Sequence, residues 1–157
     1  ISFIFTGHSL GGSLAVLSSI NYDKLLNESI ISKILNLLGY KEEIYLITFG
    51  QPRVGNKEFS DFVNRNLNKN YRITFDKDPI IGLPFKLKNG YYHQGTEIRF
   101  KMANFDKENY VIKNKFEDET YNSINLFNLK YHSKYWEFIG EKLENNLFYD
   151  KDISFDD

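Results

Sequence analysis

The residues with the clearest capacity for chemistry lie in the segment Gly7-His8-Ser9-Leu10-Gly11. It fits the pattern Gly-x-Ser-x-Gly, in which a sharp turn from a strand to a helix presents the serine hydroxyl at the end of a sheet. We expect side chains at the two flanking positions to collide with neighbouring backbone, so that both must be glycine. Ser9 is therefore the candidate nucleophile, and Leu10 N–H, at the start of the helix, is the candidate oxyanion donor. The alternative is a glycine-rich turn that only caps a helix.

A serine hydroxyl is a weak nucleophile and needs a base, and the chain has three histidines. His8 is adjacent to Ser9 and is expected to pack beneath the turn. His93 precedes a predicted strand, where a hydrogen-bonded structural histidine is the better interpretation. His132 follows the last predicted strand and begins a predicted helix, from which an imidazole can reach back over the sheet edge. An ordinary surface histidine in a helical cap is the alternative for His132.

The carboxylate that orients such a base must follow a strand on the same edge of the sheet as Ser9. A predicted strand ends in Asp76-Lys77-Asp78-Pro79, and either aspartate can serve. Pro79 restricts Asp78 to extended backbone geometry, which favours Asp78. The resulting order along the chain, Ser9, Asp78, His132, is the nucleophile, acid, base order of α/β-hydrolases.

The elements that must position these residues alternate between strand and helix in the first half of the chain. Apolar or β-branched runs predict strands at 2–6, 44–49 and 71–75, and helical spacing predicts helices after Ser9, at 29–38 and from Asn56 to about Leu67. This order favours a parallel sheet with crossover helices, that is, an α/β fold.

The second half of the chain has a different pattern. It predicts two strands, 97–101 and 110–113, joined by a turn at 104–109, and then a polar, irregular region at 115–125. A final amphipathic helix is expected at 132–147, with Tyr135, Trp136 and Ile139 directed inward.

Composition narrows the possible classes of protein. The 157 residues suffice for one domain or a large part of one, and 41% are hydrophobic. A formal net charge of -1 gives no sign of the excess positive charge that nucleic-acid-binding proteins carry. The absence of cysteine excludes disulfides and cysteine-based metal sites. No apolar run approaches the roughly 18 residues of a transmembrane helix. Because the chain begins at Ile1 inside an apolar stretch, we expect the natural start, and any signal of cellular location, to be missing.

Five segments, in this order along the chain, resemble the signatures of class 3 lipases, the fungal and plant triacylglycerol lipase group. They are Gly7-His8-Ser9-Leu10-Gly11-Gly12-Ser13-Leu14-Ala15, Thr48-Phe49-Gly50-Gln51-Pro52-Arg53-Val54-Gly55-Asn56, Asp78-Pro79-Ile80-Ile81-Gly82-Leu83-Pro84, Tyr92-His93-Gln94-Gly95-Thr96-Glu97-Ile98 and His132-Ser133-Lys134-Tyr135. In that family the acid loop supplies the catalytic aspartate, and the His-x-x-Tyr segment carries the catalytic histidine. The resemblance therefore implies the catalytic residues Ser9, Asp78 and His132, and structural roles for Arg53, Asn56 and His93.

The resemblance implies a serine carboxylic-ester hydrolase that acts on acylglycerol-type lipids without metal or cofactor. Its expected partners are a lipid or small ester substrate and, transiently, a lipid interface, with no nucleic acid. Ile80, Ile81, Leu83 and Phe85 are expected either to line an acyl groove or to belong to the core. The rival interpretations are a catalytically inactive, lipase-like binding module and a non-functional fragment.

One departure from the family is large. Family members have several strands, a lid helix and one oxyanion donor before the serine turn, and this sequence has none of them. We therefore expect residues 1–157 to be the C-terminal part of a single α/β-hydrolase lipase domain, with an exposed sheet edge. Loss of one oxyanion donor typically costs about 100- to 1000-fold in rate, so this part alone is expected to be a poor catalyst.

Overall fold

The framework of the chain is one five-stranded sheet with the strand order β1-β2-β3-β4-β5. The computed structural model describes residues 1–85, 90–101, 110–113 and 128–144. Its strands are β1 (Ser2–His8), β2 (Glu43–Phe49), β3 (Lys69–Phe75), β4 (Thr96–Phe100) and β5 (Tyr110–Lys113). The pairs β1–β2, β2–β3 and β3–β4 are parallel, and β4–β5 is antiparallel. The predicted α/β fold, with a mostly parallel sheet and a final antiparallel pair, is thus confirmed.

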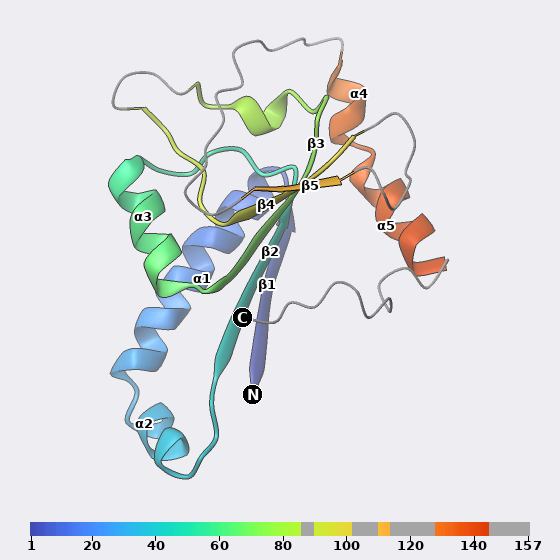
Figure 1. The fold of residues 1–157 in the computed structure, drawn as a ribbon. Helices are drawn as coiled ribbons and strands as arrows, with labels where there is room; N and C mark the ends of the chain where they lie inside the picture. Colours follow the sequence, from blue (N-terminus) through green and yellow to red (C-terminus); the bar gives the residue numbers. More distant parts are fainter. Residues whose placement is uncertain (86–89, 102–109, 114–127, 145–157) are drawn as a thin grey trace.

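The connections between the parallel strands carry the helices α1 (Leu10–Glu28), α2 (Ile30–Leu37) and α3 (Lys57–Asn66). Asn56 begins α3 because its side-chain oxygen accepts a hydrogen bond from Phe59 N–H at 3.0 Å, as predicted for its N-cap. Ser29 caps α2 in the same way, with a bond of 3.3 Å from Ser32 N–H. Successive crossovers of the same hand place α1, α2 and α3 on one side of the sheet (Figure 1).

The opposite side of the sheet is covered at one end by α5 (Tyr135–Glu144), which follows the short helix α4 (Leu129–His132) (Figure 1). Alternation of side chains along the strands therefore produces two cores. Val16 of α1, Leu46 of β2 and Val63 of α3 are fully buried in the first. Phe75 of β3 and Tyr135 of α5 form the second, with their rings stacked at 4.2 Å. Each of these buried side chains contributes roughly 1.5–3 kcal/mol.

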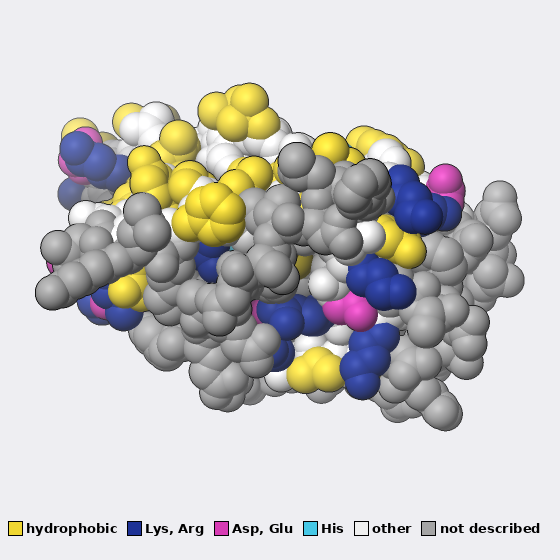
Figure 2. Space-filling model, turned by 90° about the horizontal axis from the view of Figure 1, so that it is seen from above, with side chains coloured by type: hydrophobic (Ala, Val, Ile, Leu, Met, Phe, Trp, Pro, Cys, Tyr) yellow, Lys and Arg dark blue, Asp and Glu magenta, His cyan; other side chains and the backbone are white. Residues whose placement is uncertain are grey.

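Helices α1 and α5 both direct large hydrophobic side chains toward solvent. The leucines that mark α1 as helical face solvent: Leu10, Leu14 and Leu17 are 67%, 55% and 48% exposed. The buried face of α1 is formed instead by small residues, because the helix lies close against the sheet: Gly12, Ser13, Ala15, Val16 and Ser19. Trp136 of α5 is 68% exposed, although the helical pattern had placed it inward. Hydrophobic side chains gather along one border of the molecule when it is seen from above (Figure 2).

The last helix also begins later than expected. His132 ends α4, and Ser133 and Lys134 separate it from α5, which begins at Tyr135. The predicted turn at 104–109 and the irregular region at 115–125 lie outside the described residues, as does the predicted end of the last helix. Within the described ranges, no helix is long and apolar enough to cross a membrane.

Candidate active site

Ser9 occupies a sharp turn at the carboxyl end of β1. Its backbone angles are φ 57° and ψ −129°, which makes it the one non-glycine residue with positive φ in the described part of the chain. Such a conformation typically costs about 1–3 kcal/mol and persists only when its surroundings enforce it. Here Ser9 N–H donates to the Phe49 carbonyl at 3.0 Å, and the Ser9 carbonyl accepts from Gly12 N–H at 3.0 Å. In this conformation the Ser9 hydroxyl lies within hydrogen-bond distance of His132.

The glycines around this turn differ from the expectation. A Cβ on Gly7 would overlap the Gly11 carbonyl and lie 2.7 Å from Gly12 N, so Gly7 is required by close backbone approach, as predicted. A Cβ on Gly11 would meet no described atom within 4 Å. The crowded position on the helix is instead Gly12, where a Cβ would lie 3.0 Å from the Gly7 carbonyl oxygen and 3.1 Å from Gln51 Cβ. The expectation for Gly11 was therefore wrong within the described residues, because α1 contacts the sheet through its next residue.

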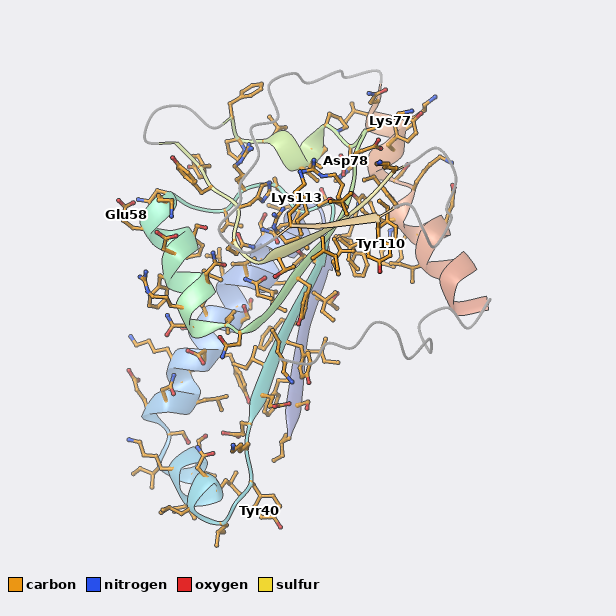
Figure 3. The ribbon with its side chains drawn as sticks, viewed as in Figure 1. Tyr40, Glu58, Lys77, Asp78, Tyr110 and Lys113 are labelled. Carbon is orange, nitrogen blue, oxygen red and sulfur yellow. The ribbon has the colours of Figure 1, made fainter. Side chains whose placement is uncertain are left out.

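Asp78 lies in the loop after β3, and its side chain is completely buried. Asp78 N–H donates to the Phe75 carbonyl at 3.1 Å, so a tight turn returns the carboxylate toward β1. One carboxylate oxygen, Oδ1, accepts from Ile80 N–H at 2.9 Å, at the start of the 3-10 turn Ile80–Gly82. The neighbouring Lys77 and Asp78 mark the upper end of the sheet, and Tyr40 lies at the opposite end of the molecule (Figure 3).

His132 connects the other two predicted side chains. Its Nδ1 is 2.9 Å from Asp78 Oδ2, and its Nε2 is 2.7 Å from Ser9 Oγ. An ionised carboxylate only accepts hydrogen bonds, so Nδ1 carries the proton and Nε2 of the neutral ring accepts from the serine hydroxyl. The histidine side chain retains 16% exposure and the aspartate none. The structure thus brings Ser9, Asp78 and His132 into one line of hydrogen bonds, in which Ser9 and His132 are partly exposed and Asp78 is buried.

Tyr135 belongs to this arrangement although the sequence indicated only a core residue. Its hydroxyl donates to Asp78 Oδ2 at 2.8 Å and accepts from Phe75 N–H at 3.0 Å. Asp78 Oδ2 therefore receives two donors, one from His132 and one from Tyr135. The signal that could have identified this contact is the position of Tyr135 three residues after His132, which places both side chains at the junction of α4 and α5.

The loop that follows Asp78 is fixed by two buried basic residues. Arg53 donates from its guanidinium to the carbonyls of Gly82 and Pro84, at 2.5 and 2.9 Å. His93 Nε2 is 2.7 Å from the Ile81 carbonyl. Both contacts agree with the structural roles expected for Arg53 and His93, since they hold the loop and not the reacting groups.

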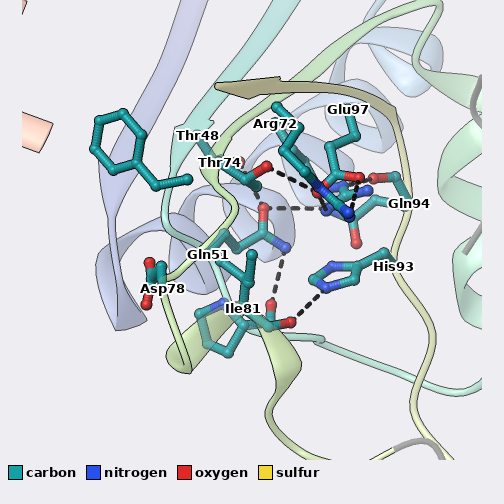
Figure 4. A network of polar contacts seen from close by, with 12 residues as sticks. Thr48, Gln51, Arg72, Thr74, Asp78, Ile81, His93, Gln94 and Glu97 are labelled. Atoms are coloured by element: carbon teal, nitrogen blue, oxygen red, sulfur yellow. Dashed lines mark hydrogen bonds and ion pairs between the residues drawn. The ribbon is translucent and has the colours of Figure 1, made fainter. Parts of the chain in front are cut away.

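A wider network of buried polar groups lies behind this loop (Figure 4). Arg72 Nε donates to the Gln94 carbonyl at 2.6 Å, and Thr74 donates to Glu97 at 2.8 Å. Burial, together with the charges of Arg72 and Arg53, lowers the pKa of His93 well below its ordinary value. His93 is therefore neutral near pH 7 and donates from Nε2 to the Ile81 carbonyl.

A cavity lies between the end of β1 and helix α5. A cavity of about 280 Å³ is lined by Gly7, His8, Phe49, Tyr135 and Trp136, with Thr6 and Ile139. The residues expected either to line an acyl groove or to form core do not border this cavity. Ile81 is buried core, and Phe85 is 49% exposed.

The candidate oxyanion donor lies where the turn predicts. Leu10 begins α1, and its N–H has no hydrogen-bond acceptor within the described residues. The first amides of a helix lack intrahelical partners and favour negative charge. In the same part of the chain, no group of three or more histidine, aspartate or glutamate side chains is arranged as metal ligands.

Comparison with known proteins shows to which family the chain belongs. The family model described as "Lipase (class 3)" matches residues 1–88, more than half of the chain. The chain belongs to the class 3 lipase family. Among curated relatives of this class 3 lipase, a secreted mono- and diacylglycerol lipase 1 from Fusarium solani is 33% identical over 106 residues, which cover 68% of this chain and 27% of the relative. A triacylglycerol lipase OBL1 from Arabidopsis thaliana is 37% identical over 95 residues, covering 57% of this chain and 16% of the relative.

Solved structures show the same fold. A lipase from Rhizopus microsporus var. chinensis superimposes with a TM-score of 0.55 and 28% identity, covering 74% of this chain and 36% of that one. The Lip2 lipase from Yarrowia lipolytica gives a TM-score of 0.55 and 26% identity, covering 80% of this chain and 42% of that one. The sheet and helices of this chain are thus those of α/β-hydrolase lipases, and the chain spans less than half the length of these relatives.

Proposed function

We propose that this class 3 lipase hydrolyses carboxylic esters of acylglycerol-type lipids through an acyl-enzyme, with Ser9 as nucleophile, His132 as base and Asp78 as the orienting acid. The observation that carries the proposal is the line of hydrogen bonds from Ser9 Oγ to His132, at 2.7 Å, and from His132 to Asp78, at 2.9 Å. A similar solved protein, 26% identical with a TM-score of 0.54, is a triacylglycerol lipase described as having a serine protease triad at its catalytic centre.

In the acylation step, Ser9 Oγ attacks the ester carbonyl carbon while His132 Nε2 accepts the hydroxyl proton. The carbonyl oxygen becomes an oxyanion, and the ring of His132 becomes an imidazolium. Asp78, which receives Nδ1–H, stabilises that charge and keeps Nε2 directed at the serine. His132 then returns the proton to the departing alcohol oxygen, the carbon–oxygen bond breaks, and the acyl group remains on Ser9.

Deacylation uses the same groups. His132 Nε2 takes a proton from a water molecule, whose oxygen attacks the acyl carbon. The second tetrahedral intermediate collapses when His132 protonates Ser9 Oγ, which releases the carboxylic acid and restores the neutral ring.

The oxyanion requires donors that are preorganised, and Leu10 N–H is the one proposed from these residues. We propose that residues 1–157 are part of a single α/β-hydrolase domain, and that a second donor comes from a part of the protein outside this sequence. The coverage of 36% and 42% of two solved lipases supports this, since more than half of each lies outside the match.

The proposed substrates are acylglycerols. This class rests on relatives that are described as a mono- and diacylglycerol lipase and as triacylglycerol lipases. Reaching such substrates requires transient contact with a lipid–water interface.

The test is labelling of the full-length protein with a fluorophosphonate, which reacts with activated serines, beside Ser9→Ala as control. Labelling of the wild type that disappears in Ser9→Ala is expected, together with hydrolysis of tributyrin that falls at least 1000-fold in that variant. Equal labelling of both proteins, or tributyrin hydrolysis that survives within tenfold, would show that another residue does the chemistry. Absence of both reactions in the wild type would favour a lipase-like binding module.

A further inference from the structure

The side chain of His8 makes a contact that the proposed mechanism does not use. His8 Nε2 is 2.8 Å from the main-chain oxygen of His132, a residue 124 positions away in the sequence. A carbonyl oxygen only accepts, so His8 Nε2 carries the proton of this bond. The residue directly before the nucleophile thus binds the backbone of the residue that carries the base.

Aromatic contacts hold the His8 ring in place for this bond. It lies 4.6 Å from the His132 ring, with the two planes 33° apart, and 5.4 Å from the Tyr135 ring. The exposed ring of Trp136 in α5 lies 6.3 Å away, with the two planes 56° apart. These neighbours all come from the segment that carries His132, so in the folded chain they restrict the rotation of the His8 side chain and the direction of its N–H.

The segment that carries His132 needs such an anchor. Helix α4 has four residues, Leu129–His132, and His132 is the last of them. So short a helix has little stability of its own, because isolated helices below roughly 12–15 residues are marginal in water. The position of His132 at the sheet edge must therefore be fixed by contacts that α4 makes with other parts of the chain.

We propose that His8 is a positioning residue for the base: its bond to the His132 carbonyl fixes the distance between Ser9 and His132. This inference rests on the proposed function of Ser9 and His132. The bond links the backbone of His132 to the turn that carries Ser9, because His8 is covalently attached to Ser9 and binds the His132 carbonyl directly. Displacement of a catalytic group by about 1 Å can cost on the order of 100-fold in rate.

The experiment compares three variants of the full-length protein in tributyrin hydrolysis. His8→Phe keeps an aromatic ring but removes the donor, and it should lower kcat about 10- to 100-fold with KM changed less than threefold. His8→Gln places an amide N–H near the position of Nε2 and should recover kcat to within about fivefold of wild type. Tyr22→Phe removes a hydroxyl from a ring that packs against Phe3 and Phe5 of β1, outside the contacts of His8, and should stay within threefold.

Two results would overturn the proposal. One is a His8→Phe protein with kcat within threefold of wild type. The other is a His8→Gln protein as slow as His8→Phe, which would show that the donor is not the cause. All rates are to be measured at least 10 °C below the melting temperature of each variant, so that loss of folded protein does not enter kcat.

A second measurement keeps this inference separate from the proposed function. Nitrogen chemical shifts of the imidazole of His8 in the wild type should show the proton on Nε2, whereas a neutral ring with its proton on Nδ1 would overturn the proposal even without any activity. Failure of the proposed function would appear differently, as labelling that persists in Ser9→Ala.

Discussion

Replacing Tyr135 by phenylalanine removes one hydroxyl from the centre of the site and leaves everything else in place. The ring stacked on Phe75 remains, so no cavity of consequence opens. Two hydrogen bonds are lost, the donor to Asp78 Oδ2 at 2.8 Å and the acceptor for Phe75 N–H at 3.0 Å. Both partners stay buried, since Asp78 is 2% exposed and Phe75 is fully covered.

The magnitude follows from these two partners. A buried N–H left without an acceptor costs about 1–3 kcal/mol, and a hydrogen bond to a charged group contributes about 1.5–3 kcal/mol. Because Asp78 keeps Ile80 N–H and His132 as donors, the sum is an upper bound, and we expect a loss of about 2–4 kcal/mol in unfolding free energy. The looser carboxylate should also lower kcat about tenfold.

Urea unfolding followed by circular dichroism measures the free energy of unfolding, and tributyrin hydrolysis measures kcat. Tyr131→Phe is the matched control, because that ring is near Lys77 and Lys130, at 5.6 and 5.3 Å, and sits outside the Asp78 contacts. It should change stability by less than about 0.5 kcal/mol. A Tyr135→Phe protein as stable as Tyr131→Phe would refute the assignment of the hydroxyl to both partners.

Three further predictions concern other parts of the site. Gly50 and Gly39 both have positive φ, 55° and 86°, but a Cβ on Gly50 would lie 2.6 Å from the Tyr135 ring, whereas one on Gly39 would meet no described atom within 4 Å. Thermal unfolding should therefore show that Gly39→Ala lowers the free energy of unfolding by about 1–2 kcal/mol, and that Gly50→Ala lowers it by about 1–3 kcal/mol more. Only Gly50→Ala should reduce kcat. Equal losses of stability in the two variants would contradict the packing at Gly50. Asp78→Asn should lower kcat about 10⁴-fold with little change in KM, because an amide that donates to His132 favours the wrong tautomer; steady-state kinetics that show less than a tenfold loss would exclude Asp78 as the acid. Burial lowers the pKa of His93 in the folded chain, so below about pH 6.5 the unfolded chain binds a proton that the folded chain does not. The free energy of unfolding should therefore fall with decreasing pH in this range, by up to about 1.4 kcal/mol per pH unit. Urea titrations at pH 7 and 5.5 should show a smaller decrease in His93→Gln than in the wild type.

The order of elements was accessible from the sequence because each carries a strong local signal. Alternation of strand and helix, the Asn56 cap and the final pair of strands all depend on neighbouring residues. Ser9 was accessible because it lies in a motif with a strict geometric meaning, and Pro79 favoured Asp78 over Asp76. The choice of His132 over an ordinary surface histidine came from the resemblance to class 3 lipases.

What the sequence did not reveal depends on contacts between distant segments. Helical spacing marks α1 as a helix, but which face lies against the sheet is decided by close packing at Gly12, and the leucines point elsewhere. The role of Tyr135 at Asp78 likewise requires the positions of two segments 57 residues apart. The break before α5, which turns Trp136 outward, has no local signal such as proline or glycine.

The separation of the proposed reacting groups along the chain has a consequence for folding. Ser9 and His132 are 123 residues apart, and Asp78 is 54 residues from His132. Contacts of such long range require closure of long loops, which is slow compared with local helix formation. During refolding from urea, the helical signal should therefore return before Ser9 regains its reactivity toward a fluorophosphonate. The reactivity of Ser9 thus reports when the segments that carry Ser9 and His132 come together.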